Sequence, residues 1–151
     1  MSARTIRNSG LLGIISDTHD NLPLIDLAVK KLNELGVELV LHAGDYVSPF
    51  TAQHFNLLKA RLIGVYGNNC AERAMLKKLF SEFGADIRGF FAEIEVEELK
   101  IALLHGHDEE LLRSLIESEA YDLVVYGHTH QVSVERKGKT MVINPARSVA
   151  T

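Results

Sequence analysis

The sequence lacks several features that mark particular protein classes. Its 151 residues include no tryptophan, three prolines and a single cysteine, Cys70. A lone cysteine cannot form an intramolecular disulfide, which fits a reducing compartment, and we expect the cytoplasm. The longest apolar run, Leu11 to Ile15, is far shorter than the roughly 18–20 residues that span a bilayer. We therefore expect neither a membrane-spanning protein nor a secretory signal peptide.

Charge of one sign is not gathered into blocks. Sixteen basic and twenty acidic residues give a net charge of −4. Without a basic excess, binding to nucleic-acid backbone has no electrostatic source, so we expect neither a coating role on nucleic acid nor a DNA nuclease. At 46% hydrophobic and 24% charged residues, the composition excludes wholesale disorder. The length predicts a single domain over residues 11–151, after a flexible N-terminal segment over 1–10.

Short apolar runs alternate with amphipathic segments in the first half of the chain. Apolar residues three and four positions apart are typical of helices, and short runs of bulky residues are typical of buried strands. The alternation requires crossover connections, which predicts an α/β fold with a largely parallel sheet. We expect strands at 11–16, 38–43 and 61–66, and helices at 23–35, 49–58 and 71–83.

The second half is predicted to be richer in strands. Apolar and acidic residues alternate over 92–97, which is typical of a strand with one solvent-exposed face. A hairpin turning at Lys137-Gly138-Lys139 is also expected. We expect strands at 92–97, 99–104, 122–126, 131–136 and 140–144, and one helix at 109–119.

Side chains of metal-ligating types follow five of the expected strands. The carboxyl ends of parallel strands meet at one edge of a sheet, so these five loops should converge. Seven of their side chains are counted as ligands, which is more than one tetrahedral ion uses: Asp17, Asp45, His19, His105, His128, His130 and Asn68. The sequence therefore predicts two divalent metal ions and phosphoester hydrolysis. The five motifs are Asp17-Thr18-His19, Gly44-Asp45, Gly67-Asn68-Asn69, His105-Gly106-His107 and Gly127-His128-Thr129-His130.

These motifs, in this order, resemble the metal-ligand motifs of the calcineurin-like metallophosphoesterase family, most closely its small single-domain bacterial and archaeal phosphodiesterase branch. The resemblance implies a four-layer αββα sandwich of two mixed sheets with flanking helices. It also implies that a hydroxide bridging two metals attacks the phosphorus of a small phosphodiester or phosphomonoester. Asp17, His19, Asp45 and His130 would hold the first metal, and Asp45, Asn68, His105 and His128 the second. Mixed nitrogen and oxygen ligands accept Mn²⁺, our first expectation, or Fe²⁺, Zn²⁺, Co²⁺ or Ni²⁺.

Two features depart from the family pattern. Many members have His-Asp or His-Glu after the asparagine ligand, where this chain has Asn69-Cys70. An amide cannot protonate a leaving group as an imidazolium does, so poor leaving groups should turn over slowly. Asn144-Pro145-Ala146 resembles the closing Asn-Pro-Gly segment of the family, after which relatives continue for a further strand. We therefore expect a shortened chain with an exposed sheet edge.

Several assignments stay open at this stage. Asn69 and His107 are the candidate catalytic residues; Asn69 would touch the phosphate, and His107 would either contact substrate or orient a ligand. His42 and His54 are expected to be packing or surface residues. The alternative to an enzyme is a catalytically weak or inactive scaffold for protein–protein interaction, because a retromer subunit resembles this fold with its site impaired. The oligomeric state is also open, and a homo-oligomer would be compatible.

Overall fold

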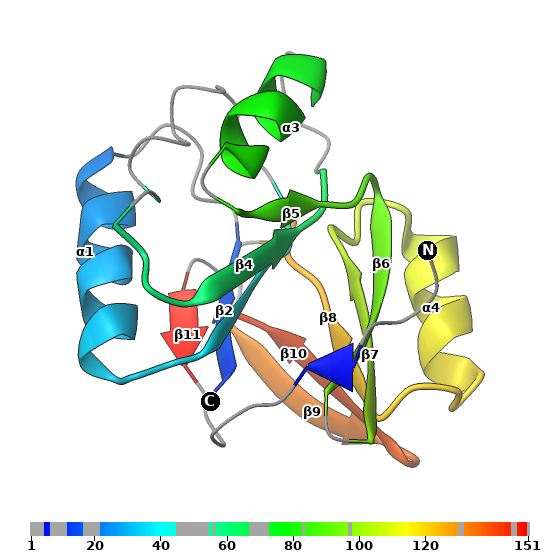
Figure 1. Ribbon diagram of the computed structural model, residues 1–151. Helices are drawn as coiled ribbons and strands as arrows, with labels where there is room; N and C mark the ends of the chain where they lie inside the picture. Colours follow the sequence, from blue (N-terminus) through cyan, green and yellow to red (C-terminus); the bar gives the residue numbers. More distant parts are fainter. Residues whose placement is uncertain are drawn as a thin grey trace.

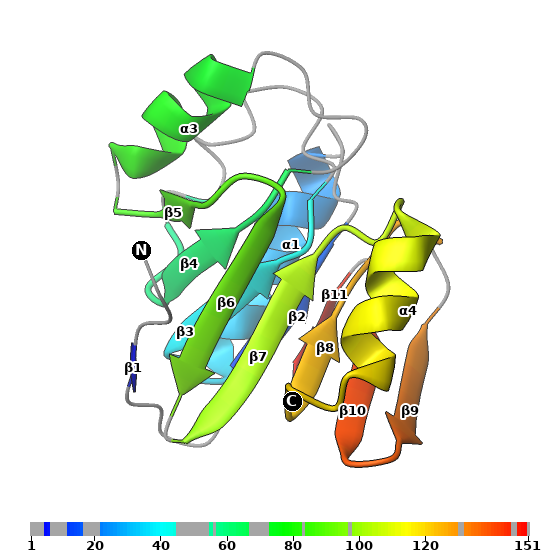
Figure 2. The same cartoon turned by 90° about the vertical axis from the view of Figure 1, so that its right-hand side faces the viewer.

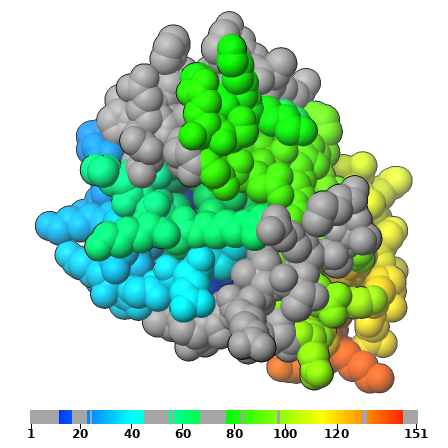
Figure 3. Space-filling model, viewed as in Figure 1, coloured from blue at the N-terminus to red at the C-terminus, as the bar shows by residue number. Residues whose placement is uncertain are grey.

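The computed structural model describes residues 5–6, 12–16, 22–44, 55, 57–66, 73–82, 84–96, 98–129, 132–145 and 148–150. Within these residues the chain forms two sheets that lie face to face, with helices on both outer surfaces (Figures 1 and 2). In the space-filling view, the blue and cyan residues of the first part of the chain lie on the left of the molecule and the yellow and orange residues of its last part on the right (Figure 3). No helix in the described ranges is long and apolar enough to cross a membrane.

The five-stranded sheet carries the first half of the fold. Its parallel strands, in spatial order, are β2 (Leu12–Ile15), β3 (Leu39–His42), β4 (Arg61–Gly64) and β5 (Asp86–Ile87). A last strand, β11 (Ser148–Ala150), pairs antiparallel with β2 at the other edge. The three central strands are almost wholly buried, which explains why their sequences are continuous apolar runs.

The six-stranded sheet is mixed. Parallel pairing joins β7 (Leu99–Leu104) to β8 (Leu123–Val125) and β8 to β10 (Thr140–Asn144). Antiparallel hairpins are formed by β6 (Phe91–Val96) with β7 and by β9 (Ser133–Lys137) with β10. Along β6, Ala92, Ile94 and Val96 are buried and the glutamates between them half-buried, so the predicted alternation is present, whereas Phe91 at the start of the strand is exposed. In spatial order the strands are β1 (Thr5–Ile6), β6, β7, β8, β10 and β9.

Three apolar clusters hold the four layers together. The largest joins the facing sheets and includes Leu41 and Ile63 from one and Leu103 and Val125 from the other. A second cluster packs α1 (Leu22–Glu34) and α3 (Arg73–Ser81) on the outer face of the five-stranded sheet. The third packs α4 (Glu109–Glu117) on the outer face of the six-stranded sheet. The predicted αββα sandwich of two mixed sheets is confirmed.

Three short strands of the described residues, β1, β5 and β11, were not expected. β1 lies in the segment that was assigned as flexible, and it pairs in parallel with β6. β11 follows Asn144-Pro145 and pairs with β2, so the expectation of a missing further strand is wrong. Elements of two or three residues are too short to leave a hydrophobic period, which is why these were missed. Apart from Phe55, Leu57 and Leu58, the helix expected over 49–58 lies outside the described residues.

Gly13 on β2 is a packing requirement. A Cβ atom at this position would lie 2.7 Å from Leu32 Cδ2, 3.1 Å from Val40 Cγ2 and 3.3 Å from Val37 Cγ1, all in buried side chains. We predict that Gly13→Ala lowers the free energy of unfolding by about 1–3 kcal/mol, because overpacking forces neighbouring side chains to shift. Urea unfolding followed by circular dichroism measures this; an unchanged midpoint would show that α1 moves away without cost.

Candidate active site

The ends of β3 and β7, which belong to different sheets, lie together at one edge of the sandwich. One hydrogen bond shows this directly. Nδ1 of His105, the first residue after β7, lies 2.8 Å from the carbonyl oxygen of Ala43, the first residue after β3. The ends of strands from different sheets are thus joined at the position where the sequence predicted convergence.

His105 is held in a single tautomer. Its side chain is buried, with 1% of the residue exposed. A carbonyl oxygen only accepts hydrogen bonds, so the Ala43 contact requires that Nδ1 carries the proton. In the neutral ring Nε2 then keeps its lone pair. A backbone carbonyl that orients an imidazole in this way is a common arrangement behind metal-binding histidines.

The lone pair of His105 Nε2 faces a second imidazole. His128 Nδ1 lies 3.3 Å from His105 Nε2, and the two rings meet at 75°. Two imidazole nitrogens bound to one ion at about 2.0–2.1 Å stand about 3.0–3.4 Å apart. The observed spacing therefore fits a shared divalent cation, and the chemistry of this donor pair suits one.

His128 has an unusual backbone conformation. Its φ angle is 72°, in the left-handed region that residues with a side chain seldom adopt. The loop is fixed by Asn144 on β10, whose Nδ2 donates to the Gly127 carbonyl at 3.0 Å and to Thr129 Oγ1 at 2.8 Å. Asn144 is fully buried. Its two hydrogen bonds flank His128 on both sides and support the strained conformation.

His107 lies beside the other two histidines but is exposed. Its ring centroid is 5.6 Å from that of His105 and 6.2 Å from that of His128. The next residue, Asp108, caps α4 by accepting a hydrogen bond from the Leu111 backbone N–H at 3.1 Å. The cap fixes the loop on the side away from β7. Exposure favours the first of the two roles expected for His107, contact with substrate.

His42, the last residue of β3, supports the neighbouring loop. It is fully buried, contacts Phe55 edge-on, and accepts a hydrogen bond at Nδ1 from the Gly44 backbone N–H at 3.0 Å. The expectation of a packing residue is confirmed, but the ring also bonds to the backbone that leads to Asp45. No sequence pattern indicates that bond.

We predict that His42→Leu lowers the free energy of unfolding by about 1–3 kcal/mol, because the buried Gly44 N–H loses its acceptor. His42→Asn, whose side-chain oxygen can replace Nδ1 as the acceptor, should recover part of the loss. Thermal unfolding followed by circular dichroism compares the two variants. Equal stability of the two would mean that packing alone explains the role of His42.

The remaining predicted site residues lie outside the described part of the chain. These are Asp17, His19, Asp45, Asn68, Asn69 and His130. Within the described ranges, no group of three or more histidine, cysteine, aspartate or glutamate side chains forms a metal-binding cluster. Of the predicted site residues, the structure places His105, His107 and His128 next to one another. It also adds Asn144 and His42 as supporting residues, of which only Asn144 had a signal in the sequence, its Asn-Pro step.

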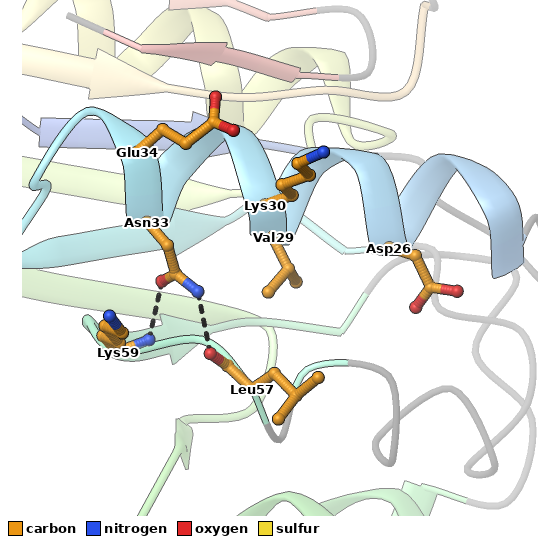
Figure 4. A pocket seen from close by; sticks show the side chains of 7 residues that line it. All are labelled: Asp26, Val29, Lys30, Asn33, Glu34, Leu57 and Lys59. Carbon is orange, nitrogen blue, oxygen red and sulfur yellow. Dashed lines mark hydrogen bonds between the residues drawn. The ribbon is translucent and has the colours of Figure 1, made fainter.

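A pocket of about 760 Å³ elsewhere has a different character (Figure 4). Figure 4 shows Asn33 of α1 bonded to the segment just before β4, where Nδ2 donates to the Leu57 carbonyl and Oδ1 accepts from the Lys59 N–H, both at 2.8 Å. The start of β4 lies at the edge opposite the strand ends. Among the described residues, the lining mixes lysines with carboxylates and includes no histidine. This pocket does not belong to the histidine site.

Comparison with known proteins identifies the family. Residues 11–148 match the model of the calcineurin-like phosphoesterase superfamily domain. This chain belongs to that superfamily. A phosphodiesterase of Methanocaldococcus jannaschii is 42% identical over 135 residues, which cover 89% of this chain and 81% of the relative. The solved structure of an archaeal phosphodiesterase superposes with a TM-score of 0.85 at 41% identity, covering 89% of this chain and 82% of that one.

More distant calcineurin-like relatives share the fold. Phosphodiesterase YfcE of Escherichia coli is 26% identical over 145 residues, covering 86% of this chain and 74% of YfcE. Vps29 of Entamoeba histolytica, solved in complex with zinc, has a TM-score of 0.65 at 21% identity, covering 89% of this chain and 73% of that one. The latter likeness concerns the fold alone. The family and its phosphodiesterase members establish that this chain is a hydrolase acting on phosphoesters, of a superfamily that uses divalent metals.

Proposed function

We propose that this chain is a metal-dependent phosphodiesterase with a dinuclear site. The ligands are those that the sequence motifs offer, and Mn²⁺ is the first candidate, ahead of Fe²⁺, Zn²⁺, Co²⁺ and Ni²⁺. Small diesters are the substrate class that the named relatives support. The seven proposed ligands are Asp17, His19, Asp45, Asn68, His105, His128 and His130.

One observation carries the proposal. His105 Nε2 and His128 Nδ1 stand 3.3 Å apart, and the bond from His105 Nδ1 to the Ala43 carbonyl places the proton on Nδ1, so Nε2 carries the lone pair with which an imidazole binds a metal. Bound divalent cations supply Lewis acidity, which lowers the pKa of a water molecule and neutralises charge on the phosphate.

The remaining polar residues of the site act on the substrate. His107 is exposed next to the pair and can donate a hydrogen bond to a phosphate oxygen. Asn69 directly follows the Asn68 ligand in the sequence and offers amide hydrogen bonds rather than a proton. With no imidazolium at position 69, esters with good leaving groups are favoured. Aryl diesters should therefore turn over faster than alkyl diesters.

The test begins with metal-free protein. Chelation should abolish hydrolysis of bis(4-nitrophenyl) phosphate, and added Mn²⁺ should restore it. Elemental analysis of the reloaded protein should find about two Mn²⁺ ions per chain. Asp45→Asn should lower both the rate of hydrolysis and the Mn²⁺ content. 4-Nitrophenyl phosphate in the same assay compares monoester with diester. If none of the five candidate metals restores hydrolysis of either ester, the proposal fails and the scaffold alternative takes its place.

A further inference from the structure

An aromatic side chain outside the ligand motifs lies next to the site. Phe90, in the turn between β5 and β6, keeps 49% of its surface exposed. Its ring centroid is 6.5 Å from that of His107, at an interplanar angle of 66°. His107 in turn neighbours His105 and His128. One imidazole ring therefore separates the exposed phenyl group from the proposed metal ligands.

The position of Phe90 is fixed by the strand that leads to another ligand motif. Tyr66 follows β4 and precedes Gly67-Asn68 in the sequence. Its backbone N–H donates to the Gly89 carbonyl at 2.6 Å, and its ring meets Phe90 edge-on at 5.4 Å and 63°. Tyr66 is only 8% exposed, so it supports Phe90 from the buried side. Edge-to-face contacts of this kind hold aromatic rings in one orientation.

We propose that Phe90, held in place by Tyr66, is an aromatic platform that binds a flat ester group of the substrate, either an aryl ring or a nucleobase. This inference rests on the proposed function, because the phosphate of that substrate would lie at the proposed metal site, of which His105 and His128 are ligands. A phenyl ring that is half exposed to water gains apolar contact when a flat group covers it. The platform thus selects aromatic over alkyl phosphodiesters by binding. This agrees with the preference for good leaving groups expected from Asn69.

The neighbouring phenylalanine provides a matched control. Phe91 is 36% exposed, but its ring packs against Tyr121, with ring centroids 6.4 Å apart. The Tyr121 hydroxyl donates to Glu93 Oε1 at 2.9 Å. Tyr121 also packs with α4 on the outer face of the six-stranded sheet. Phe91 therefore belongs to a structural cluster, and its removal should leave substrate preference unchanged.

The test measures binding of two phosphonates that the enzyme cannot hydrolyse. Isothermal titration calorimetry of Mn²⁺-loaded protein compares phenylphosphonate, which carries a ring, with methylphosphonate, which does not. We expect phenylphosphonate to bind the unmodified protein about 10-fold more tightly, as stacking on an aromatic side chain commonly achieves. Phe90→Ala should remove that preference, Phe90→Tyr should keep most of it, and Phe91→Ala should keep all of it.

Two results would overturn the platform: equal dissociation constants for the two phosphonates, or a preference that survives Phe90→Ala. Hydrolysis of bis(4-nitrophenyl) phosphate by the same samples is followed in parallel. If hydrolysis persists while the preference is absent, the platform is wrong and the phosphodiesterase proposal stands. If neither hydrolysis nor phosphonate binding occurs, both are wrong. Thermal unfolding of each variant shows whether the variant is folded, so that a loss of binding is not mistaken for a loss of structure.

Discussion

Replacing His105 with alanine should lower kcat toward an aryl phosphodiester by at least 10²–10³-fold and reduce the Mn²⁺ content of the protein. The variant loses Nε2, which faces His128 Nδ1 at 3.3 Å, and the Ala43 carbonyl loses its donor in a buried position. Leaving that carbonyl unsatisfied should also cost about 1–3 kcal/mol of stability. Steady-state kinetics, elemental analysis and thermal unfolding measure the three effects.

His107→Ala is the matched control for this prediction. His107 differs from His105 by two positions and lies 5.6 Å away by ring centroid, yet it is exposed. We expect His107→Ala to keep its Mn²⁺ content and its stability, and to lose activity less severely than His105→Ala. A His105→Ala protein that keeps both its metal and its turnover would contradict the assignment of His105 as a ligand.

The fold followed from the sequence where elements were long enough to show a period. Apolar runs such as 99–104 were located to the residue, and the alternation over β6 was assigned to the correct kind of strand. β1 and β11 were not predicted because a strand of two or three residues is too short to show a hydrophobic period. Their pairing depends on backbone groups of distant strands, β6 and β2, and a local pattern does not encode that dependence.

The sequence predicted which side chains form the site, but not the contacts that hold them in place. Motif order indicated which side chains converge, and His105 and His128 do so. The supporting contacts could not be predicted, because the acceptor for His105 Nδ1 is a backbone carbonyl 62 residues away. Any residue has such a carbonyl, so Ala43 carries no signal of its own. The buried ring of His42 was missed as a support for the Gly44 backbone for the same reason.

Asn144→Ala should weaken Mn²⁺ binding by about 10–100-fold although Asn144 is not a proposed ligand. The reason is its hold on the loop that carries His128. Two buried hydrogen bonds, to the Gly127 carbonyl and Thr129 Oγ1, keep His128 at a φ of 72°. A left-handed residue costs on the order of 1–3 kcal/mol and persists only where its surroundings fix it. Without Asn144 the loop should relax, which would move His128 Nδ1 away from His105 Nε2.

Thr140→Val separates this positioning effect from a loss of stability. Thr140 lies on the same strand, is also fully buried, and donates from Oγ1 to the Tyr121 carbonyl at 2.7 Å, at the end of β10 away from the histidines. Both variants should lose about 1–3 kcal/mol of stability. Only Asn144→Ala should weaken Mn²⁺ binding in a metal titration, and excess Mn²⁺ should restore part of its activity. Equal Mn²⁺ affinity in the two variants would show that Asn144 stabilises the fold without positioning His128.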